Sequence, residues 1–311
     1  MLNSPVVSVV LPVFNGGKYL KNAIDSVLLQ NTSGWELLIV DDGSKDDTAA
    51  ICDAYCKKDD RITAFHQQNG GVNAARAKGI SYARGEYLTF LDADDALAPD
   101  ALEQMLRHFE EGISVVCCGD KERVLDQSGF IKELWSGTIA PGVCGKLFKT
   151  SLFKNMDYAL ERRLVMGEDL LLCSIYSLSV NRAKVMPFNA YLVNQGNDAS
   201  VTKTFKHNWE YEKYYFKRVE ELFLKKCTAL DSFEEIRFLI NKSRLNAMKY
   251  VMLDGGKINY DDPEYKSTCA YFKEKGTGLG PSEKLLFTLK NARLYRLILG
   301  TFMILNKRKN G

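Results

Sequence analysis

Acidic side chains stand at two points where an apolar run of the sequence ends. Asp41 and Asp42 close one such run, and Asp92, Asp94 and Asp95 close another. Carboxylates this close together repel each other unless a divalent cation or several hydrogen-bond donors lie among them. Their hard oxygen atoms suit Mg²⁺ or Mn²⁺, and a diphosphate would complete the coordination. These residues therefore predict a metal–nucleotide site.

Simpler interpretations of the same carboxylates remain open at this level. Asp41 and Asp42 could cap the helix that follows them, and residues 92–95 could form a solvated acidic loop. An Asp-x-Asp after an apolar strand is also how phosphatases of the haloacid dehalogenase type present a nucleophile and an acid. That motif lies on the first strand and has Thr or Val where this chain has Ala96, which argues against the phosphatase.

A further acidic pair, Glu168-Asp169, precedes the apolar residues 170–173. Two carboxylates in the first turn of a buried helix are favoured by the helix dipole, which gives the pair a purely structural explanation. The chemical alternative is general-base catalysis, because an alcohol is a weak nucleophile at neutral pH. Lys146, which precedes this pair, could be part of the scaffold of the acceptor side, could screen a diphosphate, or could extend its stem over the core.

The elements that must position these groups alternate between strand and helix. Short runs rich in β-branched residues predict strands at 6–11, 36–40, 62–66, 87–91 and 114–118, with helical patterns between them. Repeated β-loop-α units imply an α/β fold with a mostly parallel sheet flanked by helices. Ligands bind at the carboxyl ends of such strands. The segments that follow strands are therefore of interest, namely 12–17, 41–44, 67–71 and 92–95.

Local signals refine the expected elements. Ser44 with Asp47 predicts a capping box that opens a helix, Gly85 predicts the end of another, and Pro99 predicts a first helical turn. Residues 121–133 contain two short apolar pairs around Ser-Gly, which predicts a hairpin.

Composition and charge limit the class of protein. The chain has 311 residues, 46% of them apolar and 26% charged, which excludes general disorder and fibrous structure. From about residue 205 the pattern is helical and rich in Lys, Glu, Leu and Tyr. We therefore predict an α/β domain over 1–204, which would hold both the nucleotide site and the acceptor site, and a helical C-terminal region over 205–311. Residues 1–110 hold 10 Lys and Arg against 16 Asp and Glu, whereas residues 205–311 hold 21 against 13.

Four segments, taken in order, resemble family 2 glycosyltransferases with the GT-A fold. A thinner resemblance continues through residues 145–148 and 167–170, and none extends beyond about residue 204. The four segments are VVLPVFN at 9–15, VDDGS at 40–44, GGVNAAR at 70–76 and GEYLTFLDADD at 85–95.

The resemblance implies roles for residues that bind the nucleotide. Pro12, Phe14 and Asp41 fall where the family holds the base, with the ring stacking and the carboxylate accepting from the uracil N3–H. Asn15 and Asp42 belong to the same two segments and are expected to line the nucleotide site.

The resemblance also implies the groups that carry the chemistry. Asp92 falls where the family contacts the ribose or the metal, and Asp94 where it ligates Mn²⁺ or Mg²⁺ on the diphosphate. Arg76 faces the donor in relatives, although the Asn that commonly follows it is Ala77 here. Asp169 is implied as the general base, with Glu168 beside it.

The implied function is transfer of a hexosyl or N-acetylhexosaminyl group, with inversion, from a nucleotide diphosphate donor, UDP-linked, to a saccharide or lipid-linked acceptor hydroxyl. The pathway implied is bacterial-type surface polysaccharide or glycolipid assembly. The alternative is a non-catalytic relative that only binds nucleotide sugars or acts as a scaffold.

The C-terminal tail leaves two interpretations open. Residues 284–311 carry seven basic residues and no acidic one. They could form an amphipathic helix on an anionic membrane surface, or a terminal helix packed on the protein. The longest uncharged run, 297–306, is about half of the ~20 residues that a membrane span needs.

The remaining features point to an intracellular protein. The eight Cys lack the spacing of a metal site or a disulfide framework, and no secretory signal is recognised at the N-terminus. We expect a cytoplasmic location, at the inner face of the membrane if the tail binds lipid. No nucleic-acid motif accompanies the basic tail, so no nucleic-acid partner is expected. His66, His108 and His207 have no catalytic context, and the oligomeric state is open.

Overall fold

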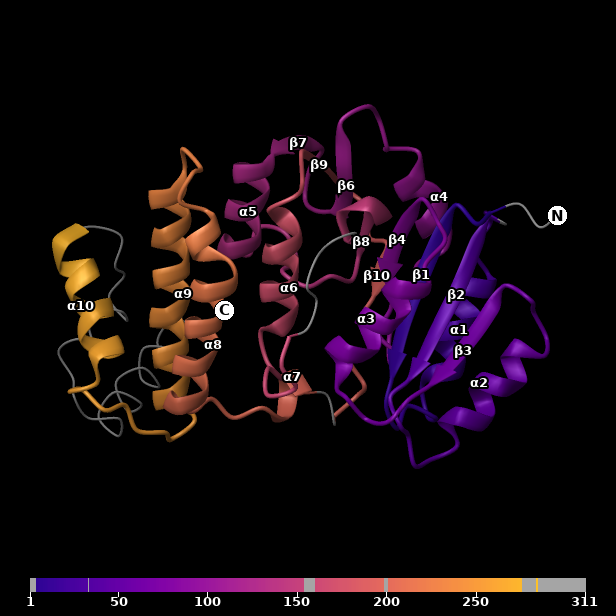
Figure 1. Ribbon diagram of the computed structural model, residues 1–311, viewed down its shortest axis with the longest axis horizontal. Coiled ribbons are helices and arrows are strands. Elements are labelled where there is room, and N and C mark those ends of the chain that lie inside the picture. Colours follow the sequence, from indigo (N-terminus) through magenta and orange to yellow (C-terminus); the bar gives the residue numbers. More distant parts are fainter. Residues whose placement is uncertain (1–3, 33, 154–159, 199–200, 276–283, 285–311) are drawn as a thin grey trace, which may run out of the picture. The chain divides into compact units, whose positions relative to one another are not determined.

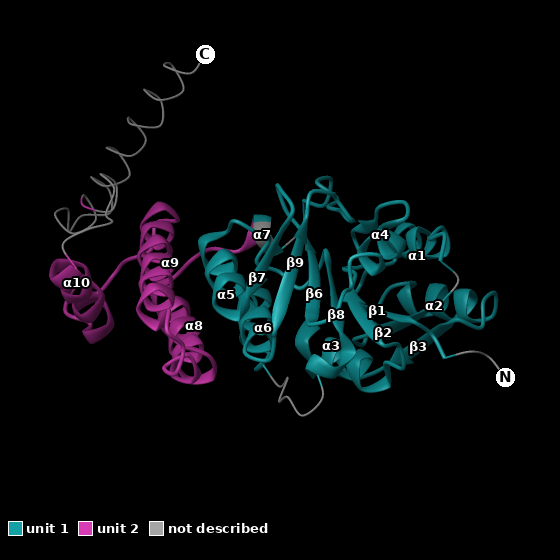
Figure 2. Cartoon of the chain, turned by 90° about the horizontal axis from the view of Figure 1, so that it is seen from above, with its two compact units in different colours: residues 1–203 teal, residues 204–311 magenta. Residues whose placement is uncertain are grey.

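A computed structural model of the chain describes residues 4–32, 34–153, 160–198, 201–275 and 284. They belong to two compact units, residues 1–203 and 204–311, which Figure 2 draws in different colours. Apart from Lys284, the tail discussed above lies outside the described residues. Within the described chain, no helix has both the length and the apolar composition needed to cross a membrane.

The first unit is built on an eight-stranded sheet with the strand order β3-β2-β1-β4-β8-β6-β9-β7 (Figure 1). Strands β5 and β10 form a separate two-stranded sheet. The strands are β1 (Val7–Val13), β2 (Trp35–Asp41), β3 (Ile62–His66), β4 (Tyr87–Phe90), β5 (Ala96–Leu97), β6 (Ile113–Cys118), β7 (Arg123–Asp126), β8 (Lys146–Lys149), β9 (Arg182–Met186) and β10 (Tyr191–Leu192).

The first half of the main sheet is parallel. β1 pairs with β2 and β4, and β2 pairs with β3, all in parallel register. β6 and β9 are also parallel, whereas β8 and β7 run antiparallel to their neighbours. The carboxyl ends of β1, β2, β3 and β4 therefore meet at one edge, as predicted for an α/β fold.

Helices cover both faces of this sheet (Figures 1 and 2). Val9 and Leu11 of β1 face a core shared with α1 and α4, while Val10 faces α3, where Gly79 leaves room for it. The helices of the first unit are α1 (Leu20–Leu28), α2 (Thr48–Cys56), α3 (Val72–Tyr82), α4 (Ala101–Leu106), α5 (Gln127–Ser136), η1 (Thr150–Phe153) and α6 (Glu168–Ser177), with α7 (Val201–Thr204) at the boundary.

The hairpin predicted for residues 121–133 is wrong. The segment forms strand β7 and then helix α5, because the Asp126 carboxylate caps the helix by accepting the Gly129 N–H at 2.7 Å. Phe130 and Leu134 are spaced for one helical face and are buried. The segment Asp126-Gln127-Ser128-Gly129 is thus the capped start of a helix here rather than a turn.

The predicted capping box at Ser44 is also wrong. Helix α2 begins at Thr48, and its N-cap residue, Asp47, makes no capping hydrogen bond through its side chain. Ser44 instead ties two strand ends together, since its hydroxyl accepts the Asn15 N–H at 2.8 Å. Helix α3 ends at Tyr82, before Gly85, and α4 begins at Ala101, two residues after Pro99.

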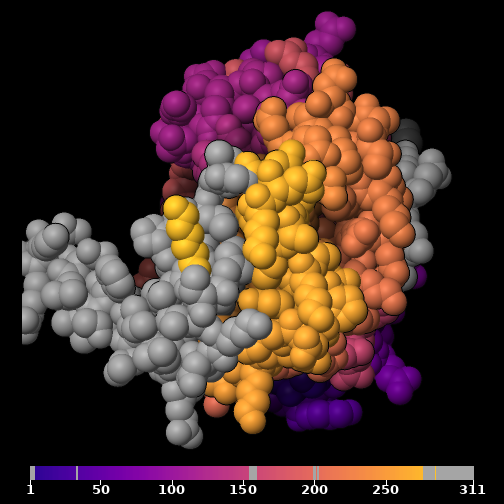
Figure 3. All heavy atoms as spheres, turned by 90° about the vertical axis from the view of Figure 1, so that its left-hand side faces the viewer, coloured from indigo at the N-terminus to yellow at the C-terminus, as the bar shows by residue number. Residues whose placement is uncertain are grey.

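The second unit is helical, as predicted for the C-terminal region. Its helices are α8 (Trp209–Leu222), η2 (Leu224–Lys226), α9 (Phe233–Leu253) and α10 (Pro263–Lys275). Leu245 and Met252 of α9 pack with Tyr265 and Phe272 of α10 in a core of their own. Figure 3 shows α9 in orange and α10 in yellow, lying side by side.

Candidate active site

A cavity of about 690 Å³ opens at the carboxyl edge of the parallel strands. All four segments singled out from the sequence contribute to its lining, together with the segment that leads into α6. Of the predicted site residues, those that line the cavity are Pro12, Phe14, Asn15, Asp42, Arg76, Asp92, Asp94, Glu168 and Asp169. The side chain of Phe14 is half exposed, which leaves an aromatic face free to stack on a planar group.

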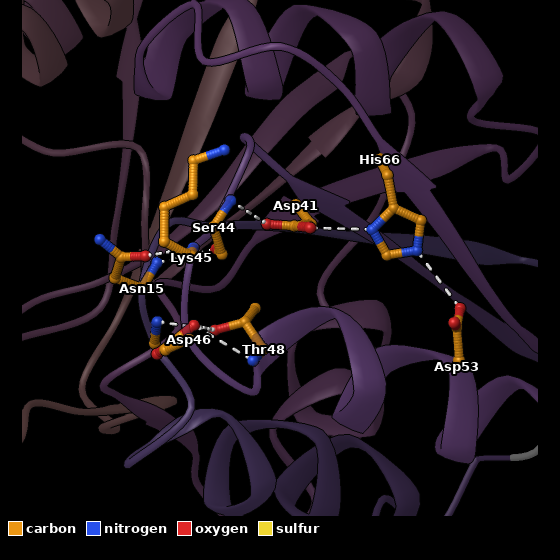
Figure 4. A network of polar contacts seen from close by, with 9 residues as sticks. Asn15, Asp41, Ser44, Lys45, Asp46, Thr48, Asp53 and His66 are labelled. Carbon is orange, nitrogen blue, oxygen red and sulfur yellow. Dashed lines mark hydrogen bonds and ion pairs between the residues drawn. The ribbon is translucent and has the colours of Figure 1, made fainter.

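Asp41 does not line this cavity. Neighbouring residues of a strand point to opposite sides, so Asp41 and Asp42 diverge at the end of β2. The Asp41 carboxylate accepts the Ser44 N–H at 3.0 Å and lies 2.8 Å from Nδ1 of His66, whose Nε2 lies 3.3 Å from Asp53 (Figure 4). The predicted contact between Asp41 and a base thus stays a prediction, and this network was not foreseen.

Electrostatics within this network favour an ion pair. Burial opposes ionisation of Asp41, but the hydrogen bonds from Ser44 and His66 outweigh it and lower the pKa of Asp41. The hydrogen bond to Asp41 raises the pKa of His66 above its usual value. The sequence provided no catalytic context for His66, and the structure shows it as the partner of a buried carboxylate.

Asp42 organises the loop that precedes α3. Its Oδ1 accepts the Gly70 N–H and the Gln67 side-chain amide, both at 2.8 Å, and its Oδ2 accepts the Gly71 N–H at 2.7 Å. Gly71 has φ +92°, a left-handed conformation that glycine adopts without strain. Asp42 therefore fixes the start of α3, the helix that carries Arg76 into the cavity.

Arg76 joins the two halves of the site. Arg76 is 2% exposed, and its guanidinium donates to Asp92 through Nη2 at 3.1 Å and to Asp169 through Nη1. Burial alone would lower the pKa of Arg76, but the charges of Asp169 and Asp92 outweigh it and hold the group protonated. One cation thus sets the separation between a carboxylate at the end of β4 and a carboxylate at the start of α6.

Glu168 is the neighbour of Asp169 in the sequence, and its pKa is raised above the ordinary value of a glutamate. Burial, with the neighbouring charge of Asp169 as the second cause, raises the pKa of Glu168 to about 7. A carboxyl group that titrates near neutrality suits proton transfer. Both members of the Glu-Asp pair therefore have properties that bear on catalysis, and their position as the first two residues of α6 also agrees with the helix-dipole explanation.

Asp94 has a different environment from Asp92. Its Oδ2 accepts the side-chain amide of Asn197 at 2.8 Å. Among the described residues, no three His, Cys, Asp or Glu side chains converge to hold a metal ion. Mg²⁺ usually takes one or two protein carboxylates and completes its shell with substrate phosphates and water, so the oxygen atoms of Asp92 and Asp94 fit such a shared site.

Tyr191 and Lys146 support the edges of the cavity. The hydroxyl of Tyr191, in β10, accepts the Asp92 N–H at 3.1 Å. Lys146 is 1% exposed, and its ammonium group donates to the carbonyls of Ala140 and Gly142 at 2.5 Å each. Gly142 faces Asp169 so closely that a Cβ there would lie 3.3 Å from the carboxylate. Lys146 is therefore a fully buried support of this loop, neither extended over the core nor a lining residue of the cavity.

Sequence reasoning missed several lining residues, among them Asn69, Asn73, Arg162 and Asn197. Asn73 carried a usable signal, since it lies three residues before Arg76 and so on the same helical face. Arg162 and Asn197 come from irregular segments with no periodicity to read. Their places in the cavity depend on tertiary packing.

Comparisons with known proteins agree with this architecture. Residues 8–155 match the model of glycosyl transferase family 2. Glycosyltransferase GlyG of Streptococcus pneumoniae serotype 4 is 28% identical over 305 residues, covering 87% of this chain and 96% of that protein. Glycosyltransferase RC0461 of Rickettsia conorii is 37% identical over 150 residues, which are 48% of this chain and only 25% of that protein.

Solved structures share the fold. Residues 1–349 of S. aureus TarS in complex with UDP superpose with a TM-score of 0.61 at 20% identity, covering 96% of this chain and 91% of that one. Mannosyltransferase PcManGT of Pyrobaculum calidifontis, in complex with GDP-Man and Mn²⁺, superposes with a TM-score of 0.54 at 16% identity, covering 95% and 84%. The N-terminal unit of this chain thus contains a glycosyl transferase family 2 domain, over residues 8–155, and has the GT-A fold.

Proposed function

We propose that this protein is an inverting, metal-dependent glycosyltransferase that moves a sugar from a UDP-linked donor to an acceptor hydroxyl. The observation that carries the proposal is the bridge from Asp92 through Arg76 to Asp169 inside one cavity. The bridge joins Asp92, which we assign to the donor, to Asp169, which we assign to the acceptor. The TarS complexes with UDP and UDP-GlcNAc support a uridine nucleotide.

The proposed reaction is a single in-line displacement. The acceptor oxygen attacks the anomeric carbon from the face opposite the diphosphate, and the bond from that carbon to the diphosphate oxygen breaks. The diphosphate leaves with the electron pair, and Asp169 takes the acceptor proton. One displacement inverts the configuration of the sugar. Phe14 and Pro12 would hold the base, which keeps the donor at the β1 side of the cavity.

Asp94, with Asp92 beside it, would hold Mn²⁺ or Mg²⁺, which stabilises the charge that develops on the leaving diphosphate. Asn197 holds Asp94 through its side-chain amide at 2.8 Å, and so fixes the direction of that carboxylate.

Asp94→Asn is expected to abolish most of the gain in UDP affinity that Mn²⁺ provides. The amide keeps the size of the side chain but is a much poorer cation ligand, so we expect a loss of about tenfold or more, or ~1.4 kcal/mol. Isothermal titration calorimetry of UDP in Mn²⁺ and in EDTA measures it. Asp60→Asn, an exposed carboxylate remote from the cavity, serves as the control. Equal UDP affinity of the wild type in both buffers would contradict the metal role.

The transfer itself is tested by release of UDP from UDP-glucose and UDP-GlcNAc, first with water and then with saccharide acceptors. Release that requires Asp169 supports the enzyme. Tight binding of a nucleotide sugar with no release under any condition would favour the alternative, a non-catalytic nucleotide-sugar-binding or scaffolding protein.

The kind of acceptor, the pathway and the location in the cell belong to the same proposal. We infer an acceptor that is a saccharide or a lipid-linked saccharide, in surface polysaccharide or glycolipid assembly on the cytoplasmic side. The basic composition of residues 284–311 supports contact with an anionic membrane surface.

A further inference from the structure

One short segment lies against the whole acidic loop, residues 92–95, at the carboxyl end of β4. We call it the β10 segment; it comprises residues 190–197 and contains β10 and the turn that follows. β10 pairs antiparallel with β5, which comes directly after the acidic loop. The Ala98 N–H donates to the Ala190 carbonyl at 3.0 Å. The two segments are thus joined as strands at the point where the acidic loop ends.

Tyr191 is the central contact of the β10 segment. Its hydroxyl accepts the Asp92 N–H at 3.1 Å and also interacts with the Asp95 carboxyl group. Burial, the largest cause, raises the pKa of Tyr191, so the hydroxyl stays neutral. A neutral hydroxyl can accept from one group and donate to another at the same time. Tyr191 therefore ties the first and the last aspartate of the loop to one oxygen atom.

Two further contacts of the β10 segment restrain carboxylates directly. The Asn194 N–H donates to Oδ1 of Asp95 at 2.7 Å, and the side-chain amide of Asn197 donates to Oδ2 of Asp94 at 2.8 Å. The partners in these two bonds are 99 and 103 positions apart in the sequence. No local turn could bring them together, so these contacts depend on the pairing of β10 with β5.

The acidic loop needs such support because its carboxylates repel one another. Arg76 offsets the charge of Asp92, whereas the described partners of Asp94 and Asp95 are neutral groups. A divalent cation would remove the repulsion, and it binds best where the carboxylate oxygens already point to one place. Groups that orient metal ligands in this way commonly change metal affinity or activity by about 10- to 100-fold.

We propose that the β10 segment pre-forms the acidic loop for the metal and the diphosphate, with Tyr191 as a positioning residue. The inference rests on the proposed function, because it concerns the same metal site, and it adds a segment to which no sequence motif pointed. Tyr191 is not among the residues that line the cavity. Its effect on a ligand must therefore pass through the loop that it holds.

The test is calorimetry of UDP with Tyr191→Phe, in Mn²⁺ and in EDTA. Phenylalanine keeps the packing of the ring, while the Asp92 N–H and the Asp95 carboxyl group lose their shared partner. We expect UDP affinity in Mn²⁺ to fall about tenfold, the lower end of the usual effect of losing a group that orients a metal ligand. In EDTA the affinity should equal that of the wild type, because no metal then depends on the loop.

Tyr55→Phe is the matched control. The Tyr55 hydroxyl also donates to a carboxylate, that of Asp25, at 2.7 Å, and neither residue lines the cavity. The control loses a comparable hydrogen bond of the same unit and should bind UDP normally in both buffers. If Tyr191→Phe loses affinity equally in Mn²⁺ and in EDTA, its hydroxyl serves the fold, and the positioning role is overturned.

The Asp94→Asn background separates positioning from any other effect of Tyr191. If Tyr191 acts through the acidic loop, Tyr191→Phe should add little to the loss of UDP affinity in Mn²⁺ that Asp94→Asn already causes. Two losses that simply multiply would show that Tyr191 acts elsewhere and would overturn the proposal.

Asn197→Ala is a second variant of the β10 segment, chosen because Asn197 lies in an irregular stretch whose truncation the fold should tolerate. It removes the amide that holds Asp94 and should also weaken UDP binding in Mn²⁺ more than in EDTA. A wild-type gain from Mn²⁺ that survives in both Asn197→Ala and Tyr191→Phe would refute the positioning role alone. A wild type with equal UDP affinity in both buffers would instead refute the metal role in the proposed function, and this inference with it.

Discussion

Replacement of Arg76 by methionine is expected to lower kcat by about 10² or more, because the distance between the donor-side and acceptor-side carboxylates is no longer fixed. The guanidinium is buried and contacts both Asp92 and Asp169. Without it, two carboxylates face each other across the cavity with no cation between them. Arg76→Lys should recover only part of the rate, since an ammonium group cannot span two carboxylates as a planar fork does.

The same change should move the pH dependence of the reaction. Burial raises the pKa of Asp92, and Arg76 is the largest influence that lowers it. Loss of Arg76 therefore raises the pKa of Asp92 further, and a higher pH is needed to ionise that carboxylate. The acidic limb of the kcat/KM profile should shift upwards in Arg76→Met and return towards the wild type in Arg76→Lys.

A purely structural role of Arg76 predicts a different result. Arg123 is a matched control, because it also bridges two carboxylates, Asp120 at 2.7 Å and Glu133 at 2.5 Å, outside the cavity lining. Arg123→Met should lower the melting temperature without moving the pH profile. An Arg76→Met enzyme that is merely less stable, with an unchanged pH profile, would contradict the bridging role.

The location of the site was predictable because it depends on backbone topology. Parallel strands bring their carboxyl ends to one edge, so residues 12–17, 41–44, 67–71 and 92–95 meet whatever their side chains are. The resemblance to family 2 then supplied chemical roles. The prediction failed where one pattern fits two structures, as at residues 126–129, whose Asp-Gln-Ser-Gly sequence suits both a turn and a capped helix start.

Side-chain direction was the part that sequence patterns could not supply. Asp41 and Asp42 are adjacent and chemically identical, yet one pairs with His66 and the other holds the glycine loop before α3. The contact between Arg76 and Asp169 joins residues 93 positions apart, on different helices. No periodicity links such positions, because their meeting depends on how α3 and α6 are placed in space.

Asp169→Asn is expected to lower kcat by about 10²–10⁴-fold, the usual effect of removing a general base. The amide keeps the shape of the side chain and can no longer accept the proton of the acceptor. Donor affinity should change little, because in the proposed mechanism Phe14 and Pro12 would hold the nucleobase and Asp94 would hold the diphosphate through the metal. Asp94→Asn should give the opposite pattern, with weakened donor binding in Mn²⁺.

Glu168→Gln should be milder and should change the pH profile. Since the pKa of Glu168 is raised to about 7, its carboxyl group ionises as the pH rises through neutrality. The new negative charge favours transfer of the acceptor proton to the Glu-Asp pair, so wild-type kcat should rise through that range. Glutamine stays neutral, and the rise should be lost in Glu168→Gln.

The free energy of unfolding of the wild type should fall over the pH range in which its kcat rises. The pKa of Glu168 is higher in the folded protein, about 7, than the ordinary value of 4.5, so the folded state binds the extra proton between those pH values. The free energy of unfolding therefore falls as the pH rises from 4.5 through about 7. Glu168→Gln should be more stable than the wild type at pH 8 by roughly 1–2 kcal/mol, allowing for partial solvent screening, and the gain should disappear below pH 4.5.

Together the two variants decide which carboxylate takes the proton. If Glu168→Gln abolishes transfer while Asp169→Asn retains most of it, Glu168 is the base and Asp169 only anchors Arg76. If both retain activity, the base lies elsewhere and the pair only begins α6. Measuring kcat, donor affinity and melting temperature on the same preparations, with Arg76→Met alongside, separates these outcomes. Asp169→Asn removes the base together with one Arg76 contact, whereas Arg76→Met breaks the bridge and leaves the base in place.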